Sequence, residues 1–76
     1  MSITIEDVEL AYSQNFNKFM SITGVWGVSK TYDRIIVYID NPLAYREIPD
    51  HVIVQRMNRQ VSVPVQVIEM KRPTLF

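Results

Sequence analysis

The sequence GVWGVSKTYDRIIVYI, residues 24–39, contains two apolar stretches joined by a polar turn. Val25–Lys30 alternates with a period of two residues, which is typical of a β-strand. The polar residues Thr31–Arg34 follow, and Ile35–Ile39 is a second run of β-branched and aromatic residues. Two short strands with a turn between them predict a β-hairpin.

The register of this hairpin determines which side chains share a face. If Lys30 lies opposite Ile35 across the turn Thr31–Arg34, the register of the hairpin follows. One face then carries Trp26, Val28, Ile35, Val37 and Ile39, and the other carries Val25, Gly27, Ser29, Ile36 and Tyr38. The Trp26 face is the more apolar, so we expect a helix to cover it.

An amphipathic helix is predicted before the hairpin. Thr4 followed by Asp7 three positions later resembles a capping box, which places the first helical residue near Ile5. Apolar residues then recur at spacings of three and four, namely Ile5, Val8, Tyr12, Phe16 and Phe19. Residues 21–24 break the pattern and end the helix.

A second, short helix is predicted after the hairpin. Asp40 or Asn41 can cap it, Pro42 suits its first position, and Pro49 stops it. Its expected core contacts are Leu43 and Ile48.

The last third of the chain is rich in valine. Val61–Glu69 alternates strictly and predicts a strand. Pro64 has no N–H to donate, so we expect it at the start of that strand or on an unpaired side of it. Val52–Met57 is left open as an edge strand.

Gly24 and Gly27 are separated by two residues, as in some glycine loops that approach phosphates. Such loops lie between a strand and a following helix, whereas here a helix precedes and a strand follows. We therefore interpret Gly24 as a helix C-cap and Gly27 as a strand glycine that admits close packing.

Taken in order, the predicted elements form a single α+β domain spanning residues 1–76. The expected architecture is a two-layer sandwich, α-β-β-α-(β)-β, with the helices on one face of a small mixed or antiparallel sheet. Two helices cover only one face, and an uncovered apolar face marks an interaction site. The expected contact residues for self-association are Ile36, Tyr38, Ile68, Met70, Leu75 and Phe76.

The composition also favours self-association. The chain has 76 residues, of which 47% are hydrophobic, with no cysteine and one histidine. A core of this size rarely supplies more than about 3–5 kcal/mol, so small domains usually gain stability from disulfides, metals or partners. Disulfides are excluded, and a structural zinc site needs more cysteine and histidine than the chain has. We expect no cofactor and a homo-oligomer.

Charge is balanced overall but not along the chain. Eight basic and eight acidic residues give a formal net charge of zero, which argues against a strongly basic nucleic-acid-binding field. Residues 1–50 carry a net charge of −3 and residues 51–76 a net charge of +3, which favours head-to-tail contacts. The start of the chain has no signal-peptide pattern and no stretch long enough to span a membrane, so we expect a cytoplasmic protein.

Several short motifs carry a resemblance. These are TGVWGV at residues 23–28, DRIIVYIDNP at residues 33–42, Ile48-Pro49 and VPV at residues 63–65. Over residues 20–70 the chain resembles small uncharacterised proteins of hyperthermophilic archaea. It is also similar to a small α/β sandwich module found beside some bacterial serine peptidases. The resemblance implies the fold and a thermostable protein, and it implies no activity.

Chemistry-bearing residues are few. His51 follows Asp50, and an imidazole held by a carboxylate can act as a general acid or base. No serine or cysteine near it in sequence has the context of a nucleophile, so we predict a solvent-facing loop histidine and a protein that is not an enzyme. The charged turn Lys30–Arg34 is likewise predicted to be a solvated hairpin loop.

Nucleic-acid binding is the alternative function. The candidate contacts are Arg34, Arg56, Arg59, Lys71 and Arg72. Proteins that bind single strands on a sheet place aromatic side chains among their positive charges, but residues 52–72 contain no aromatic residue. Tyr38 is the best stacking candidate, although we expect it to lie in an oligomer interface.

Overall fold

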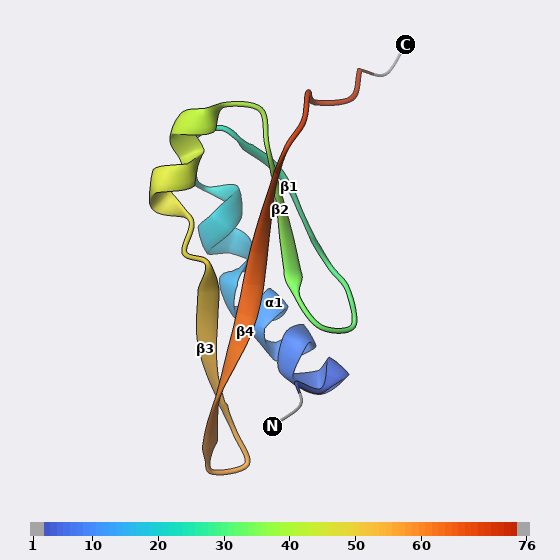
Figure 1. Ribbon diagram of the computed structural model, residues 1–76, viewed down its shortest axis with the longest axis vertical. Coiled ribbons are helices and arrows are strands. Elements are labelled where there is room, and N and C mark those ends of the chain that lie inside the picture. The colour runs from blue at the N-terminus through green and yellow to red at the C-terminus, as the bar shows by residue number, and fades with distance from the viewer. Residues whose placement is uncertain (1–2, 75–76) are drawn as a thin grey trace.

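The computed structural model describes residues 3–74, which form one α-helix, one 3-10 helix and four strands (Figure 1). In chain order they are α1 Ile5–Met20, β1 Val25–Lys30, β2 Ile35–Ile39, η1 Pro42–Glu47, β3 His51–Arg56 and β4 Arg59–Glu69. The α+β class is confirmed. The segment left open as an edge strand is β3, and the predicted second helix is the 3-10 helix η1.

The sheet is mixed and built around β4. Its strand order is β1-β2-β4-β3, so β1 and β3 are the edges. β2 runs antiparallel to β1 and parallel to residues 65–69 of β4. β3 pairs antiparallel with residues 59–64, on the other side of β4. The long strand β4 therefore joins two halves of the sheet that are staggered along its length.

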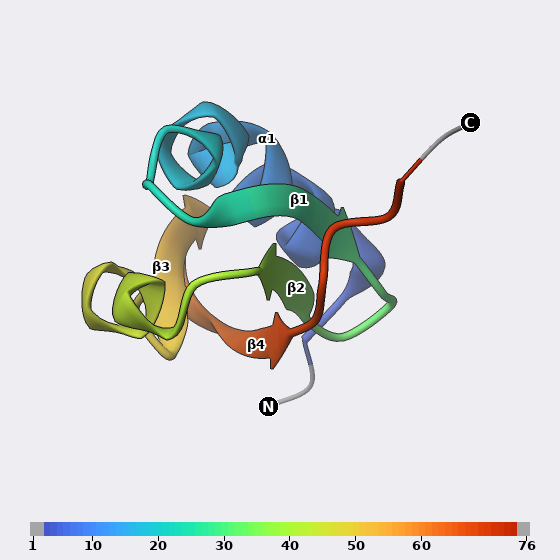
Figure 2. The same cartoon turned by 90° about the horizontal axis from the view of Figure 1, so that it is seen from above.

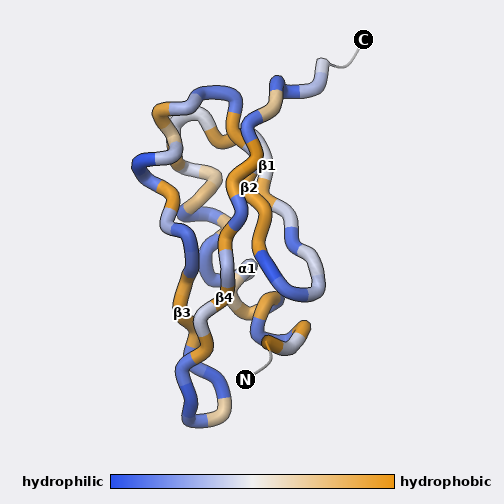
Figure 3. The backbone as a smooth tube through the Cα atoms, in the orientation of Figure 1, coloured by the Kyte–Doolittle hydropathy of each residue, from blue (hydrophilic) through white to orange (hydrophobic). Residues whose placement is uncertain are grey.

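Helix α1 packs on one face of this sheet and contacts all four strands (Figure 2). Apolar residues predominate along β2 (Figure 3). The side chains of the shared core are Val8, Ala11, Phe19, Val25, Ile35, Val37, Ile39, Ala44, Ile48, Val54, Val61, Val63 and Val65. Within residues 3–74, no helix has the length and apolar character needed to cross a membrane.

The predicted capping box of α1 is confirmed. The N–H of Asp7 donates to Thr4 Oγ1 at 3.2 Å, and the N–H of Thr4 donates to the Asp7 carboxylate at 3.1 Å. The predicted apolar stripe is correct for Val8 and wrong for Ile5, which is exposed. The cause is the burial of Asp7, because Ile5 lies about 160° around the helix from that residue.

The cap gives a first prediction. Thr4→Ala removes the acceptor for the Asp7 N–H and for a 3.2 Å hydrogen bond from Arg56 Nη2. We expect it to lower the free energy of unfolding by about 1 kcal/mol, as N-cap substitutions typically do. Thr4→Ser is the control, since it keeps the hydroxyl. Urea unfolding curves that coincide for the two variants would contradict the assigned cap.

The hairpin register is confirmed except at one position. Lys30 lies opposite Ile35, as predicted, but the register shifts between Val25 and Gly27. This β-bulge adds one residue to β1, so Val25 enters the core and Trp26 turns to the opposite face. The prediction that α1 covers Trp26 is therefore wrong, and the prediction that Val25 lies on the uncovered face is wrong as well.

The connection from β2 to β3 also differs from prediction in detail. Asn41 caps η1 by accepting a 3.0 Å hydrogen bond from the N–H of Leu43. Ile48 is buried, as predicted, but Leu43 is 63% exposed and Ala44 is buried in its place. The small side chain of Ala44 fits in the core because η1 packs closely against the turn before β1. A Cβ atom at Gly24 would lie 3.3 Å from Ala44 Cβ.

Position 24 needs a glycine because of its backbone conformation, not because α1 ends there. Its φ is +98°, and an added Cβ would lie 3.0 Å from the Cβ of Asn41. The C-cap of α1 is Ser21, so the interpretation of Gly24 as the C-cap is wrong. Gly27 does admit close packing, because its added Cβ would lie 3.4 Å from the ring of Tyr38.

β3 and β4 form a tight hairpin. Its two loop residues, Met57 and Asn58, have φ values of 54° and 62°, as in a type I′ turn. In such a hairpin the residue pair next to the turn exchanges two backbone hydrogen bonds, and every second pair repeats this. Pro64, opposite His51, falls between these pairs, so its missing N–H belongs to the side away from β3. This placement on an unpaired side agrees with the prediction.

Candidate interaction surface

The face of the sheet opposite α1, here called the open face, is not covered by any element within residues 3–74 (Figure 2). Strand alternation and register place twelve side chains on it: Trp26, Ser29, Ile36, Tyr38, His51, Ile53, Gln55, Gln60, Ser62, Pro64, Gln66 and Ile68. All twelve residues are exposed or half-buried. The set contains no acidic residue, no lysine and no arginine, so the open face is electrically neutral apart from His51.

An aromatic pair forms the most apolar part of the open face. The rings of Trp26 and Tyr38 stack with centroids 5.1 Å apart and planes 28° apart. The indole N–H of Trp26 donates to the carbonyl of Met70 at 3.0 Å, and the N–H of Met70 donates to Ile39 at 2.9 Å. Trp26 therefore reaches across β2 to the chain that leaves β4, and this holds its ring on the surface of the sheet.

The predicted contact residues fall on or beside this pair. Ile36, Tyr38 and Ile68 share the open face, with Tyr38 directly opposite Ile68, and Met70 lies exposed at its margin. The predicted contacts Leu75 and Phe76 lie outside the described residues. Sequence reasoning missed Trp26 as a member of this face. The available signal was Gly27, because an isolated glycine in a strand pattern often marks a bulge.

The rest of the open face is more polar. Ile53 on β3 is 57% exposed and lies opposite Ser62 on β4. Arg34 borders the face and donates a 3.1 Å hydrogen bond to Gln66 Oε1. Its guanidinium also donates to both oxygens of Asp33, at 3.0 and 3.2 Å, which lowers the pKa of Asp33. The neighbouring carboxylate of Asp33, just before the start of β2, therefore compensates the charge of Arg34.

The five predicted nucleic-acid contacts do not gather into one patch. Arg34 is paired with Asp33 beside the open face, and Arg72 lies 3.8 Å from Asp40 at the other end of β2. Arg56 and Arg59 both lie against Asp7, on the side of the sheet that faces α1. Lys71 is exposed after the end of β4. Basic residues of the second half of the sequence therefore pair with acidic residues of the first half inside one chain, as Arg56 does with Asp7 and Arg72 with Asp40.

The Asp7 cluster is the tightest polar contact between α1 and the sheet. The Asp7 carboxylate is fully buried and accepts a 2.7 Å hydrogen bond from Arg56 Nε, while Arg59 Nη2 lies 3.6 Å away. The hydrogen bond from Arg56, followed by the one from the Thr4 backbone, lowers the pKa of Asp7 from 3.8 to about 2. The cluster fastens the first turn of α1 to the β3–β4 hairpin, which is a structural role.

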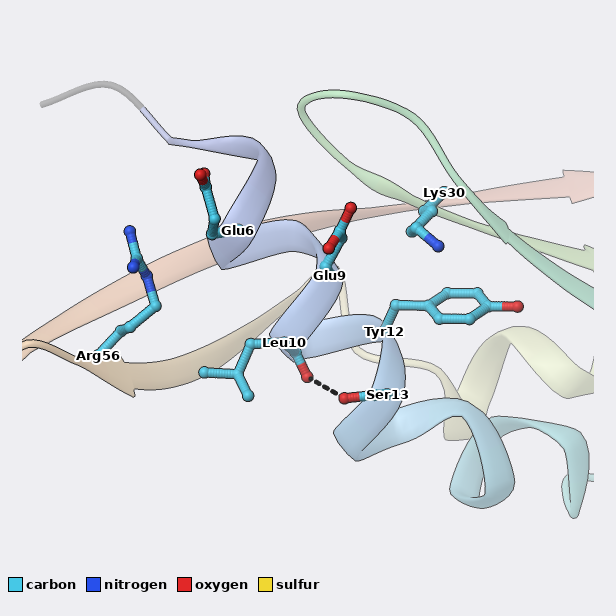
Figure 4. A pocket seen from close by; sticks show the side chains of 7 residues that line it. All are labelled: Glu6, Glu9, Leu10, Tyr12, Ser13, Lys30 and Arg56. Carbon is cyan, nitrogen blue, oxygen red and sulfur yellow. Dashed lines mark hydrogen bonds between the residues drawn. The ribbon is translucent and has the colours of Figure 1, made fainter.

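An open depression of about 700 Å³ lies beside the first half of α1 (Figure 4). Its lining residues are Glu6, Glu9, Leu10, Tyr12, Ser13, Lys30 and Arg56. The Lys30 ammonium lies 4.4 Å from the centre of the Tyr12 ring, and Arg56 is bound to Asp7. Two acidic and two basic side chains balance each other here, and both cations already have partners within the chain.

His51 is the first residue of β3, so the prediction that it lies in a loop is wrong, although its side chain is exposed. Its Nδ1 lies 2.7 Å from Asp50 Oδ1. Ser62 lies on the same face of the neighbouring strand, but no hydrogen bond joins it to His51 in the part of the chain that the structure describes. Nor do residues 3–74 bring three metal-ligating side chains together.

No family model matches this chain, and comparisons with curated proteins and with solved structures gave no match either. The resemblance to archaeal proteins and to the peptidase-associated module therefore stays a prediction.

Proposed function

We propose that this chain is a non-enzymatic domain that assembles with copies of itself, and that a second copy covers the open face. The observation that carries the proposal is the surface of Trp26, Ile36, Tyr38 and Ile68, which is apolar and is not covered by α1 or η1. Removing large apolar side chains from water stabilises an association by about 1.5–3 kcal/mol for each that is fully buried.

The charge of the open face favours a second copy as the partner. In a contact around a two-fold axis the same patch is present on both sides, so a charged residue near the axis meets its own kind. The open face has no acidic residue, lysine or arginine, and the nearby Arg34 is paired with Asp33. Like-charge repulsion is therefore absent at the centre of such a contact.

The proposal predicts the effect of Ile36→Lys. Ile36 lies between Ser29 and Gln66 in the middle of the open face, so a lysine there would place two unpaired charges in the contact. We expect the parent protein to sediment as an oligomer, and Ile36→Lys to lose the open-face contact and sediment as a smaller species with the circular dichroism of the parent.

The matched control is Gln14→Lys, which adds the same charge at an exposed position of α1. It should leave the assembly intact. A monomeric parent would refute self-association, and a folded Ile36→Lys protein that still sediments at the size of the parent would refute this face as the contact.

Binding of single-stranded nucleic acid is the second candidate, and one observation favours it. The bulge in β1 places Trp26 beside Tyr38 on the open face. Trp26 donates a hydrogen bond to Met70, directly before Lys71 and Arg72, and Tyr38 lies opposite Ile68. Aromatic side chains on a sheet next to basic residues can stack with bases. A labelled oligonucleotide titrated at several salt concentrations tests this, since steeply salt-dependent binding is expected only from this candidate.

A further inference from the structure

The two edges of the sheet are protected to different degrees. The outer edge of β1 is interrupted by the bulge between Val25 and Gly27 and ends at an exposed lysine, Lys30. Bulges and lysines are devices that keep sheet edges from pairing with other chains. β3 has the sequence HVIVQR, with no proline, lysine or bulge, and its pairing with β4 is regular from end to end.

The outer edge of β3 also presents free backbone groups. Arg56 and Arg59, the pair next to the turn, exchange backbone hydrogen bonds between β3 and β4. Every second pair along the two strands does the same. His51, Ile53 and Gln55 fall between them, so their N–H and C=O groups point away from β4. No backbone hydrogen bond from elsewhere in residues 3–74 reaches Ile53 or Gln55. In Figure 1, no helix or strand lies beyond β3 on that side.

We propose that β3 pairs with β3 of a second copy, antiparallel and around a two-fold axis at Ile53, so that two four-stranded sheets become one of eight strands. The proposal does not depend on the contact through the open face, because it uses the backbone of an edge strand. Its register follows from the side chains and from the ends of the strand.

Centring the pair on Ile53 is the register that fits best. It places the three residues with outward backbone groups opposite one another, and the two exposed isoleucines meet across the axis. A shift by two residues toward the N-terminus would bring Gln55 opposite Pro49, which has no N–H, and the reverse shift would bring His51 opposite the turn residue Met57. The resulting pairs are Ile53 with Ile53, Val52 with Val54, His51 with Gln55 and Asp50 with Arg56.

The last of these pairs is complementary in charge. Arg56 carries a positive charge, and its side chain is 29% exposed beside Asp7. The side chain of Asp50 is 91% exposed and negative. The two-fold axis brings Asp50 of each copy to the Arg56 end of the other, once at each end of the paired strands, so the attraction acts twice.

A cysteine pair tests this register directly, because the chain has no cysteine of its own. In Ile53→Cys the two introduced thiols would be carried by Cα atoms about 5.5 Å apart, within the range that a disulfide bridges. Ser62 is directly opposite Ile53 on β4 and lies on the same face, so Ser62→Cys is the matched control. Its two Cα atoms would lie about 15 Å apart, which no disulfide spans.

Under mild oxidation we expect Ile53→Cys to form a covalent dimer at least tenfold faster than Ser62→Cys. Adding Gln55→Pro to Ile53→Cys should abolish this advantage, since it removes an outward N–H and leaves the ladder with β4 complete. Circular dichroism checks that each variant is folded. Equal rates for the two cysteine variants would overturn the proposal.

The same cysteine variant separates this proposal from the open-face contact. Adding Ile36→Lys to Ile53→Cys should leave the rate of disulfide formation unchanged, even where Ile36→Lys has abolished the other contact. If Ile36→Lys abolishes the cross-link, the thiols met through the open face, and pairing of the β3 edges is refuted while the proposed function stands.

Discussion

Phe19→Ala is expected to leave most of the protein unfolded at 25 °C. Phe19 is the largest of the fully buried side chains, and it holds the end of α1 against the sheet. Truncating a buried phenylalanine costs about 3–5 kcal/mol, from lost burial and from the cavity that remains. A core in a domain of this size supplies about the same amount, so little stability is left.

Phe16→Ala is the control for this prediction, because it makes the same change on the same helix at a half-buried position. The ring centroids of Phe16 and Tyr12 are 5.4 Å apart, and Phe16 lies outside the buried core. Truncating Phe16 should therefore lower the free energy of unfolding by about half as much as truncating Phe19, or less. Urea unfolding followed by far-ultraviolet circular dichroism measures both. A loss for Phe19→Ala no greater than for Phe16→Ala would show that α1 does not pack as described.

Asp7→Asn is expected to have the largest effect of any single polar substitution. It keeps the size of the side chain and an oxygen that can accept from the Thr4 N–H, but it leaves Arg56 and Arg59 without their shared counter-charge. Breaking a buried ion pair destabilises strongly, here moderated because both arginines are partly exposed. We expect the variant to melt about 10 °C below the parent at pH 7.

The same carboxylate makes stability depend on pH. The pKa of Asp7 is lowered from 3.8 to about 2 in the folded protein, so the unfolded chain takes up a proton at higher pH than the folded one. The contribution of the Asp7 carboxylate to the free energy of unfolding is therefore complete above about pH 4, and it is lost as the pH falls through 2. Asp33, whose pKa is also lowered, acts in the same direction in both proteins.

Denaturant midpoints at pH 7, 4, 3 and 2 measure this dependence. The gap between the parent and Asp7→Asn should be constant from pH 7 to 4 and close as the pH approaches 2. A gap that stays constant down to pH 2 would contradict the role assigned to the Asp7 carboxylate.

The local parts of the fold were predictable from the sequence. The capping residues Thr4 and Asp7 lie three positions apart, and the turn between β1 and β2 joins strands only a few residues long, so neighbouring residues hold the information. The apolar character of the open face also followed from simple alternation in β2. Ile36 and Tyr38 were placed correctly for that reason.

The remaining features depend on residues far apart. The parallel pairing of β2 with β4 joins Ile35 to Val65, thirty residues along the chain, and no local pattern specifies it. The Asp7 cluster escaped prediction in the same way, because its partner Arg56 lies 49 residues away. The bulge at Trp26 is different. The hairpin closes with the predicted register, Gly27 is the one local signal, and the extra residue shows in the register shift between Val25 and Gly27 and in the stacking of Trp26 on Tyr38.

The bulge in β1 has a consequence for spectroscopy. Trp26 is the only tryptophan of the chain, and it lies on the open face against Tyr38 rather than in the core beneath α1. Its emission therefore reports the polarity at the sheet surface, not the integrity of the hydrophobic core. Any molecule that covers this surface will shift the emission to shorter wavelength in a fully folded protein, so fluorescence and circular dichroism follow two separate events in this chain.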